Sequence, residues 1–246
     1  VLTIGCDKTT PALLMAASTV DIPSICLSSG PMMNGYWKGE RAGSGTIVWK
    51  ARKLLATDEI DDEEFIKIVV DATTSPGFCN TMGTATTMNS LAEGLGMSLP
   101  GCAAIPAPLS ERLEMSYRTG LHIVEMVKKD LTPSKILTRK AFENSIVLNS
   151  AIGGSTNAPI HINAIARHVG VELEIEDWEK VGLEIPMLVN LQPAGKYLGE
   201  DFHRAGGVPA VMNALLKAGK LHDSAITVNG KTVADNYADT TTKDTE

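Results

Sequence analysis

The sequence has no run of basic residues and no long apolar run. Its 246 residues carry 22 Lys and Arg against 29 Asp and Glu, which gives a formal net charge of −7. A chain without a basic patch lacks the electrostatic footprint of a nucleic-acid or anionic-membrane partner. No apolar stretch reaches the ~20 residues that span a bilayer. We therefore expect small-molecule partners, no nucleic acid and no membrane.

Cysteine is scarce, and its spacing excludes the common paired motifs. The four cysteines stand at positions 6, 26, 79 and 102, without the close pairs of a zinc ribbon or a thioredoxin-like site. A chain of this length with 43% hydrophobic residues buries a core without disulfides, so we expect a reducing, cytoplasmic setting. Cys26 and Cys102 lie in apolar surroundings and are predicted to be core residues.

The first informative stretch follows a short apolar run at residues 1–4. Cys6, Asp7 and Lys8 place a soft metal ligand, a hard metal ligand and an amine in consecutive positions. Thiolates favour iron or zinc, whereas carboxylates favour magnesium or manganese. The stretch therefore indicates either a mixed metal site or a buried cysteine beside a solvated charge pair, and these residues alone leave both readings open.

A second cysteine stands in a loop rich in glycine and proline. Cys79 lies within residues 75–85, just before a predicted helix over residues 86–95. The N-terminus of a helix favours the thiolate form that metals require. Cys79 is therefore the second candidate metal ligand.

The order of predicted elements indicates an α/β fold. A strand at residues 1–4, a helix at 12–20 and a strand at 22–27 form a βαβ unit, which favours a parallel sheet flanked by helices. Helical patterns dominate the rest. We expect a single domain over residues 1–246, with residues 1–170 as the metal-site core and residues 171–246 as a less regular extension.

Three further segments bear on the site or on the core. Residues 28–46 are rich in glycine and read either as a structural turn or as an anion or substrate loop. After Gly153 and Gly154, Ser155 or Thr156 is expected to cap a helix, with carboxylate binding as the alternative. A long amphipathic helix is predicted over residues 110–129, and its expected buried side consists of Leu113, Tyr117, Leu121, Val124 and Met126.

With both cysteine loops in view, the chain resembles the dihydroxy-acid and sugar-acid dehydratase family, which includes phosphogluconate dehydratase. Residues 6–12 with Ala16 look like the first signature of that family, residues 77–85 like its second cluster loop, and residues 151–157 like a third block. Matching segments run from Val1 to about His203. Residues 39–46 look closest to the aldonate branch, which dehydrates pentonates.

The resemblance implies a hydro-lyase that removes water from a 2,3-dihydroxy acid, such as arabinonate or xylonate, to give a 2-keto-3-deoxy acid. It implies an iron–sulfur cluster held in part by Cys6 and Cys79, of the 2Fe–2S type in preference to 4Fe–4S. It further implies a magnesium ion held by Asp7 and by Lys8 as a carbamate, substrate contacts from Ser155 and Thr156, and a homo-oligomer, dimeric or tetrameric.

The family pattern also has parts without a counterpart here. The third cluster cysteine and a second magnesium-binding aspartate belong before residue 6 in that pattern, and a magnesium-binding glutamate and the serine base belong to a C-terminal β-rich domain. The resemblance therefore implies an internal fragment that corresponds to the N-terminal domain, lacks the β-rich domain and is inactive alone.

Four alternatives to an aldonate dehydratase stay open on the sequence. Dihydroxy-acid dehydratase of branched-chain amino-acid synthesis would use the same chemistry, and a truncated domain would have no activity. A cluster-bearing electron-transfer module predicts three or four close cysteines, which the sequence lacks. A cysteine-nucleophile hydrolase would pair a thiol with one of the five histidines.

Overall fold

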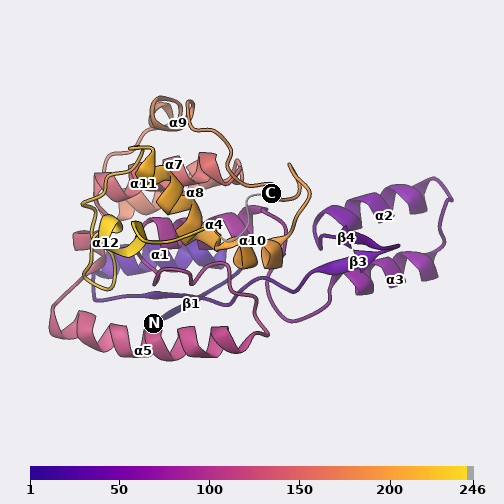
Figure 1. Cartoon of the computed structure of the whole chain (residues 1–246), viewed down its shortest axis with the longest axis horizontal. Helices are drawn as coiled ribbons and strands as arrows, with labels where there is room; N and C mark the ends of the chain where they lie inside the picture. Colours follow the sequence, from indigo (N-terminus) through magenta and orange to yellow (C-terminus); the bar gives the residue numbers. More distant parts are fainter. Residues whose placement is uncertain (243–246) are drawn as a thin grey trace.

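The βαβ unit at the start of the chain is present in the computed structural model, which describes residues 1–242 (Figure 1). β1 (Leu2–Ile4) pairs in parallel with β2 (Cys26–Ser28), and α1 (Thr9–Val20) connects them. A parallel bridge between Cys26 and Ser98 extends the pairing beyond β2. The predicted fold class, a parallel sheet flanked by helices, is confirmed, although the sheet is small and helices make up most of the structure.

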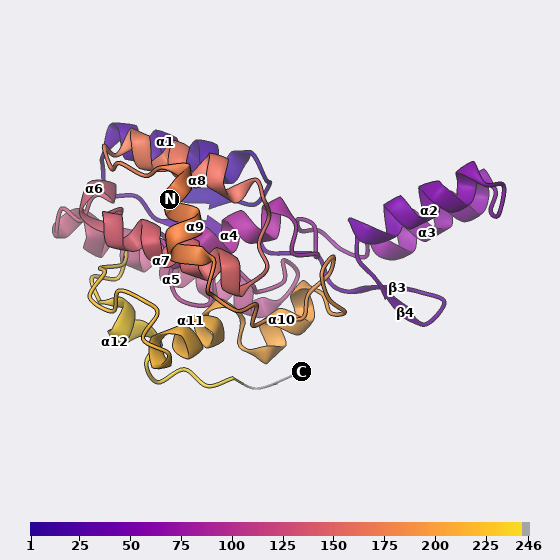
Figure 2. The same ribbon diagram turned by 90° about the horizontal axis from the view of Figure 1, so that it is seen from above.

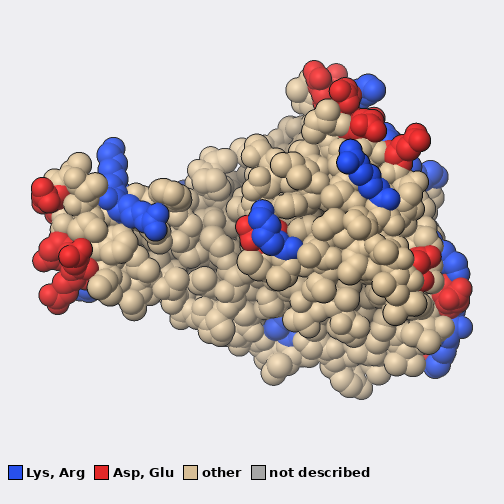
Figure 3. Space-filling model, turned by 180° about the vertical axis from the view of Figure 1, so that it is seen from behind, with Lys and Arg blue, Asp and Glu red and all other residues tan. Residues whose placement is uncertain are grey.

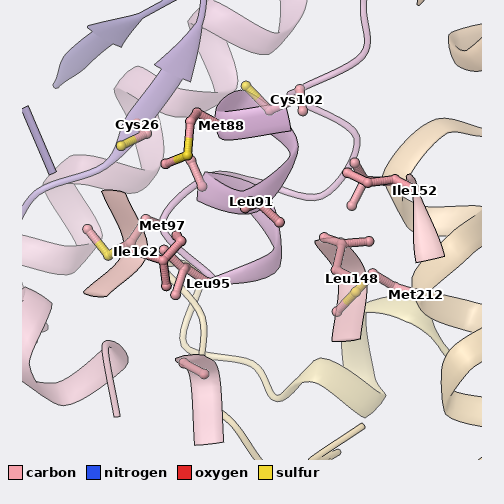
Figure 4. Close-up of a cluster of buried hydrophobic side chains, with 14 of the residues drawn as sticks. Cys26, Met88, Leu91, Leu95, Met97, Cys102, Leu148, Ile152, Ile162 and Met212 are labelled. Carbon is pink, nitrogen blue, oxygen red and sulfur yellow. The ribbon is translucent and has the colours of Figure 1, made fainter. Parts of the chain in front are cut away.

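The helices of the body surround one central helix. α4 (Thr84–Gly94) is buried from Thr86 to Gly94 and packs against α1, α7 (Arg139–Ala151), α8 (Ala158–His168) and α11 (Gly207–Lys217). Figure 4 shows part of the cluster of apolar side chains around it; the labelled residues are Cys26, Met88, Leu91, Leu95, Met97, Cys102, Leu148, Ile152, Ile162 and Met212. Burying each large side chain stabilises the fold by roughly 1.5–3 kcal/mol.

Several polar side chains of α4 are buried together with the apolar ones, and hydrogen bonds compensate for the loss of water. Asn89 Nδ2 donates to the carbonyl of Gly5 at 2.8 Å, which fastens the strand end that precedes Cys6 to the central helix. The Glu93 carboxylate accepts the N–H groups of Gly101 and Ala103 at 2.7 and 2.8 Å. Burial nevertheless raises the pKa of Glu93 to about 7.

The long helix α5 (Ser110–Lys128) lies along one side of the body, and the prediction of its buried face was largely wrong (Figure 1). The side chains of Leu113, Tyr117, Leu121 and Val124 are between 51% and 74% exposed. Met126 alone among the predicted set is buried, and the inner face otherwise carries Arg112, Met115 and Thr119.

The glycine-rich stretch opens a separate small unit, the arm, which comprises residues 35–72. It contains the antiparallel hairpin of β3 (Gly35–Trp37) and β4 (Glu40–Ala42), followed by α2 (Thr46–Ala56) and α3 (Asp62–Ala72). Figure 1 and Figure 2 both show the arm projecting from the body, and Figure 3 shows it as a narrower lobe with acidic side chains at its end. The arm has a core of its own, made of Ala42, Ile47, Ala51, Ile68 and Ala72.

A bidentate ion pair ties the base of the arm to the body. Arg41 Nε and Nη2 donate to the two carboxylate oxygens of Asp201 at 2.9 and 3.1 Å. Asn34 Nδ2 donates to the same carboxylate at 3.0 Å. Asp201 belongs to α10 (Gly199–Ala205), so the arm is held by a helix far from it in the sequence.

The remaining helices complete the body. They are α6 (Pro133–Ile136), α9 (Ile175–Gly182) and α12 (Val233–Tyr237). Leu173, Phe202, Val208 and Tyr237 belong to the same buried cluster as α4, so residues beyond 170 share the core with those before it. None of the helices in the described part of the chain combines the length and the hydropathy needed to cross a membrane.

Candidate metal and substrate site

The two cysteine loops line one cavity of about 740 Å³. Both loops are fastened to the segment that follows β2, and on the side of Cys6 the Ser29 N–H donates to the carbonyl of Ile4 at 2.7 Å. Phe78 N–H donates to the carbonyl of Gly30 at 3.0 Å, and Met32 N–H donates to the carbonyl of Phe78 at 2.9 Å. The cavity lining is Gly5, Cys6, Asp7, Ser29, Pro76, Gly77, Phe78, Cys79, Gly83, Thr84, Ala85 and Ala107.

Gly77 makes the close approach of the second cysteine loop to Pro31 and Met32 possible. Its φ angle of +132° lies in the region that favours glycine. A Cβ at this position would lie 2.5 Å from the backbone nitrogen of Met32, closer than real Cβ atoms come. The position of Cys79, two residues further on, therefore depends on a glycine at 77.

Cys6, Asp7 and Lys8 lie in the turn between β1 and α1, where the side chains are accessible to solvent. The Cys6 thiol donates to Asp7 Oδ1 at 3.1 Å, and Lys8 Nζ lies 3.9 Å from Asp7 Oδ2. The Cys6 carbonyl accepts the Thr10 hydroxyl at 2.9 Å, which fixes the turn to the first residues of α1. Cys6 and Asp7 line the cavity, whereas Lys8 is outside its lining in the described chain.

Cys79 has different surroundings, because two hydroxyl groups contact its sulfur. Ser44 Oγ lies 3.0 Å from Cys79 Sγ, and Thr81 Oγ1 lies 3.1 Å from it. Ser44 comes from the base of the arm, between β4 and α2. The sequence does not indicate either hydroxyl group as a neighbour of Cys79, although Ser44 stands in the glycine-rich stretch that is a candidate anion or substrate loop.

The first turn of α4 and the loop before α8 meet at another edge of the cavity. Thr84 lines the cavity, and its hydroxyl lies 2.8 Å from Ser155 Oγ. The backbone N–H of Ser155 donates to Thr87 Oγ1 at 3.0 Å. Ser155 is thus joined to the cavity wall through Thr84, whereas Thr156 is exposed. The partial positive charge at the N-terminus of α4 faces the cavity that the two thiols share.

His161 also belongs to the neighbourhood of the opening loop, a relation that the sequence did not indicate. Burial lowers its pKa, and the Lys8 amine lowers it further while the Asp7 carboxylate opposes both effects. Its Nε2 atom is buried and makes no hydrogen bond within the described residues.

The other two cysteines are core residues. Cys26 and Cys102 are completely buried, and burial raises the pKa of both thiols. The backbone N–H of Ser28 donates to Cys102 Sγ at 3.4 Å. Neither residue contributes to the cavity lining in the described chain, so Cys6 and Cys79 are the thiols that share the cavity.

The donors around the cavity suit part of a metal centre. Two thiols and a carboxylate line a space of about 740 Å³, and thiolates are the usual ligands of iron–sulfur clusters. Over residues 1–242, however, no three His, Cys, Asp or Glu side chains stand close enough together to hold a metal ion. Cys6, Asp7 and Cys79 therefore fit such a centre as an incomplete set of ligands.

Comparison with known proteins gives matches over almost the whole chain. The family model described as Dihydroxy-acid/6-phosphogluconate dehydratase N-terminal matches residues 1–236. D-xylonate dehydratase of Caulobacter vibrioides is 56% identical over 246 residues, which are 100% of this chain and 41% of that protein. L-arabinonate dehydratase of Rhizobium leguminosarum is 54% identical over 239 residues, 97% of this chain and 41% of that protein.

A dihydroxy-acid dehydratase of Caldanaerobacter subterraneus is more distant, at 45% identity over 239 residues, 97% of this chain and 43% of that protein. The chain thus spans about two fifths of the length of these relatives.

Proposed function

The chain belongs to the dihydroxy-acid/6-phosphogluconate dehydratase family, whose N-terminal region it matches, and we propose that it forms part of a hydro-lyase acting on sugar acids. The proposed substrate is a pentonate such as xylonate or arabinonate, and the product is a 2-keto-3-deoxy acid. The names of the xylonate and arabinonate dehydratases, at 56% and 54% identity, support this substrate class over the branched-chain dihydroxy acids, whose dehydratase is 45% identical.

The observation that carries the proposal is the shared cavity of Cys6 and Cys79. The two residues come from loops far apart in the sequence, and they are the two cysteines that are not buried in the core. A structural role alone does not explain why two thiols and a carboxylate face one space of this size. We propose that Cys6 and Cys79 hold an iron–sulfur cluster of the 2Fe–2S type and that Asp7 holds magnesium beside it.

Loss of water from a 2,3-dihydroxy acid needs removal of a weakly acidic proton at C2 and departure of hydroxide from C3. A bound cluster and magnesium would supply Lewis acids for the leaving hydroxyl and for the carboxylate end of the substrate. The residues of this chain would hold and orient these groups. Ser155 and Thr156, with the N-terminus of α4, would receive the negative charge of the substrate.

Lys8 takes part in this proposal only in a modified form. Its side chain is 66% exposed, and its amine lies 3.9 Å from the Asp7 carboxylate. An ammonium group has donors and no acceptor, so it cannot coordinate a cation. We propose that reaction with carbon dioxide converts Lys8 to a carbamate, which would add an oxygen ligand next to Asp7.

The test is anaerobic reconstitution, with iron and sulfide, of the full-length protein that contains this chain, followed by assays with xylonate, arabinonate and dihydroxyisovalerate. We expect cluster absorbance and the highest turnover with a pentonate. Cys79→Ser should remove the cluster absorbance, whereas Cys102→Ser should keep it. Absence of cluster uptake by the unmodified full-length protein would contradict the proposal, and preference for dihydroxyisovalerate would favour the branched-chain enzyme.

Lys8→Arg tests the carbamate separately. A guanidinium keeps the positive charge but forms no carbamate, so we expect magnesium content and turnover to fall while the cluster absorbance stays unchanged. An ordinary exposed lysine contributes only about 0–1 kcal/mol through an ion pair, so its replacement by Arg would leave both quantities unchanged. Normal magnesium content in Lys8→Arg would contradict the proposed role.

A further inference from the structure

The two sulfur atoms that face the cavity have opposite surroundings. Cys79 Sγ is contacted by the hydroxyl groups of Ser44 and Thr81, at 3.0 and 3.1 Å. Cys6 Sγ is 3.1 Å from a carboxylate oxygen of Asp7. A hydroxyl group can donate a proton to a thiolate, whereas a carboxylate can only repel one. The difference therefore matters most when the sulfurs are deprotonated.

Ser44 is held in place by a reciprocal arrangement with Asn80, the residue after Cys79. The Ser44 backbone N–H donates to Asn80 Oδ1 at 2.9 Å, and the Asn80 backbone N–H donates to Ser44 Oγ at 3.3 Å. Asn80 is completely buried, and its Nδ2 donates to the carbonyl of Met33 at 2.9 Å. The base of the arm and the second cysteine loop thus form one connected hydrogen-bond network.

The proton of the Ser44 hydroxyl has two acceptors within reach. Asn80 Oδ1 lies 3.1 Å from Ser44 Oγ, almost as close as the sulfur. The amide oxygen already accepts the Ser44 N–H, and an ionised sulfur is the stronger acceptor. When Cys79 is a metal ligand, the hydroxyl proton should therefore point to the sulfur.

Gly45 leaves the space that this arrangement needs. A Cβ at this position would lie 3.1 Å from Thr81 Oγ1 and 3.3 Å from Cys79 Sγ. Any side chain at 45 would crowd both the sulfur and one of its donors. A glycine at position 45 therefore lets Cys79 Sγ lie close to the base of the arm.

We infer that Ser44 and Thr81 are positioning residues that donate hydrogen bonds to Cys79 Sγ and raise the reduction potential of the bound cluster. This inference rests on the proposed function, because it needs a cluster at Cys79. A ligating thiolate can only accept hydrogen bonds, so both hydroxyl groups must then be donors. Such bonds withdraw charge from the sulfur and stabilise the more negative, reduced state of the centre.

The inference also assigns a function to the base of the arm. Ser44 contributes to the ligand environment although it lies about 35 residues before Cys79 in the sequence, in the loop that joins β4 to α2. Together with Thr81 it makes the two ends of the cluster unequal, since Cys6 has a carboxylate as its neighbour. The protein would therefore supply hydrogen-bond donors to the sulfur at the Cys79 end of the cluster.

The experiment is a redox titration of the reconstituted full-length protein that contains this chain, with the cluster followed by absorbance and by electron paramagnetic resonance. Ser44→Ala and Thr81→Val should each shift the midpoint potential to more negative values, and the double variant should shift it further. Cluster loss to a chelator should become about tenfold faster, the lower end of the usual effect of outer partners on metal affinity.

Hydroxyl-retaining variants are the matched controls. Ser44→Thr and Thr81→Ser keep a donor and should keep the potential of the unmodified protein. Ser29→Ala removes a hydroxyl from the same cavity wall, where the hydrogen bonds of the described chain do not join Ser29 to either sulfur, and should also leave the potential unchanged.

The outcomes separate the inference from the proposed function. If the unmodified full-length protein takes up no cluster, the proposed function fails. If it does, and Ser44→Ala and Thr81→Val bind the cluster at an unchanged potential, the inference alone is overturned. Should the hydroxyl-free variants fail to bind a cluster, Ser44→Thr and Thr81→Ser decide: an unchanged potential in both supports the donor role, and a shifted one rejects it.

Discussion

One backbone position decides how closely the Cys79 loop can approach the segment that follows β2. Gly77 combines a φ angle of +132° with an approach in which a Cβ would lie 2.5 Å from Met32 N. Gly77→Ala should therefore lower the free energy of unfolding by about 1–3 kcal/mol and displace Cys79 from the cavity. Chemical denaturation measures the first effect, and cluster uptake measures the second.

Gly39→Ala is the control for this prediction. Gly39 also has a positive φ angle, +82°, but a Cβ there would meet nothing within 4 Å. Gly39→Ala places a side chain at a positive φ angle but against no neighbouring atom. Its effect on the free energy of unfolding should therefore be smaller than that of Gly77→Ala, and cluster uptake should stay normal. Equal losses in the two variants would mean that the close approach to Met32 contributes nothing.

Glu93 should make the stability of the protein depend on pH. Its ordinary pKa of 4.5 rises to about 7 in the folded state because burial disfavours the charge, while the N–H groups of Ala103 and Gly101 and the Arg112 charge oppose the rise in part. Between these two values the folded state binds more protons at Glu93 than the unfolded state. The free energy of unfolding should therefore fall by up to about 3 kcal/mol as the pH rises from 4.5 to 7.

Denaturation at several pH values checks this expectation against Glu93→Gln. The amide does not titrate, so the difference in stability between the two proteins should change in favour of the variant as the pH rises. At low pH Glu93→Gln should be less stable by about 1–3 kcal/mol, because an amide offers one acceptor to two N–H donors. An exposed substitution, Glu172→Gln, serves as the control. A constant difference across this pH range would contradict the prediction.

At the level of residues, the sequence indicated Cys6 and Cys79 because chemistry is visible in residue type and local context. The prediction that Cys26 and Cys102 are core residues is confirmed, since both are completely buried, and metal binding by Cys6 and Cys79 stays a prediction. The sequence could not indicate Ser44 as a neighbour of Cys79. That contact depends on a hairpin and on the packing of the arm, and neither is encoded in the residues next to the cysteine.

Among the elements, α5 shows how periodicity can identify a helix and still assign the wrong face. The predicted helix over residues 110–129 is present as α5, Ser110–Lys128. Its sequence carries apolar residues on two sides, and the outward side is the richer one because the inward side includes Arg112 and Thr119. Apolar content alone therefore predicted Leu121 and Tyr117 as buried residues, whereas both side chains are more than half exposed.

Two substitutions in α5 test this assignment. Met126 is 1% exposed and Leu121 is 52% exposed. Met126→Ala should lower the free energy of unfolding by about 2–5 kcal/mol because it leaves a cavity. Leu121→Ala should change it by no more than about 0.5 kcal/mol, as most exposed substitutions do. Denaturant unfolding measures both, and similar losses would show that the outward face of α5 is covered in solution.

On the scale of the whole molecule, the arm and the body are two cores joined by a few polar contacts. The pKa of Arg41 is raised chiefly by its hydrogen bond to Asp201, which reflects how closely this charge pair fits. Arg41→Met leaves the half-buried Asp201 without its partner and should weaken the joint by about 1–3 kcal/mol. We expect faster amide hydrogen exchange in β3 and β4 and little change in α4.

Arg52→Met is the control, since Arg52 is exposed on α2 and stacks on Trp49 within the arm. It removes the same charge without touching the joint, so exchange in the hairpin should stay as in the unmodified protein. Faster exchange throughout the body in Arg41→Met would mean that arm and body unfold together, which would contradict the description of two cores.

The distance in sequence between Cys6 and Cys79 has a consequence for how the chain folds. As ligands of one cluster, the two thiols would close a loop of about 70 residues. Such a cross-link lowers the conformational entropy of the unfolded chain, which stabilises the folded state by about 4 kcal/mol. The loop encloses α1, β2 and the arm. A metal centre here would thus cross-link the chain. Its removal should make the enclosed segment the first part of the protein that a protease cleaves.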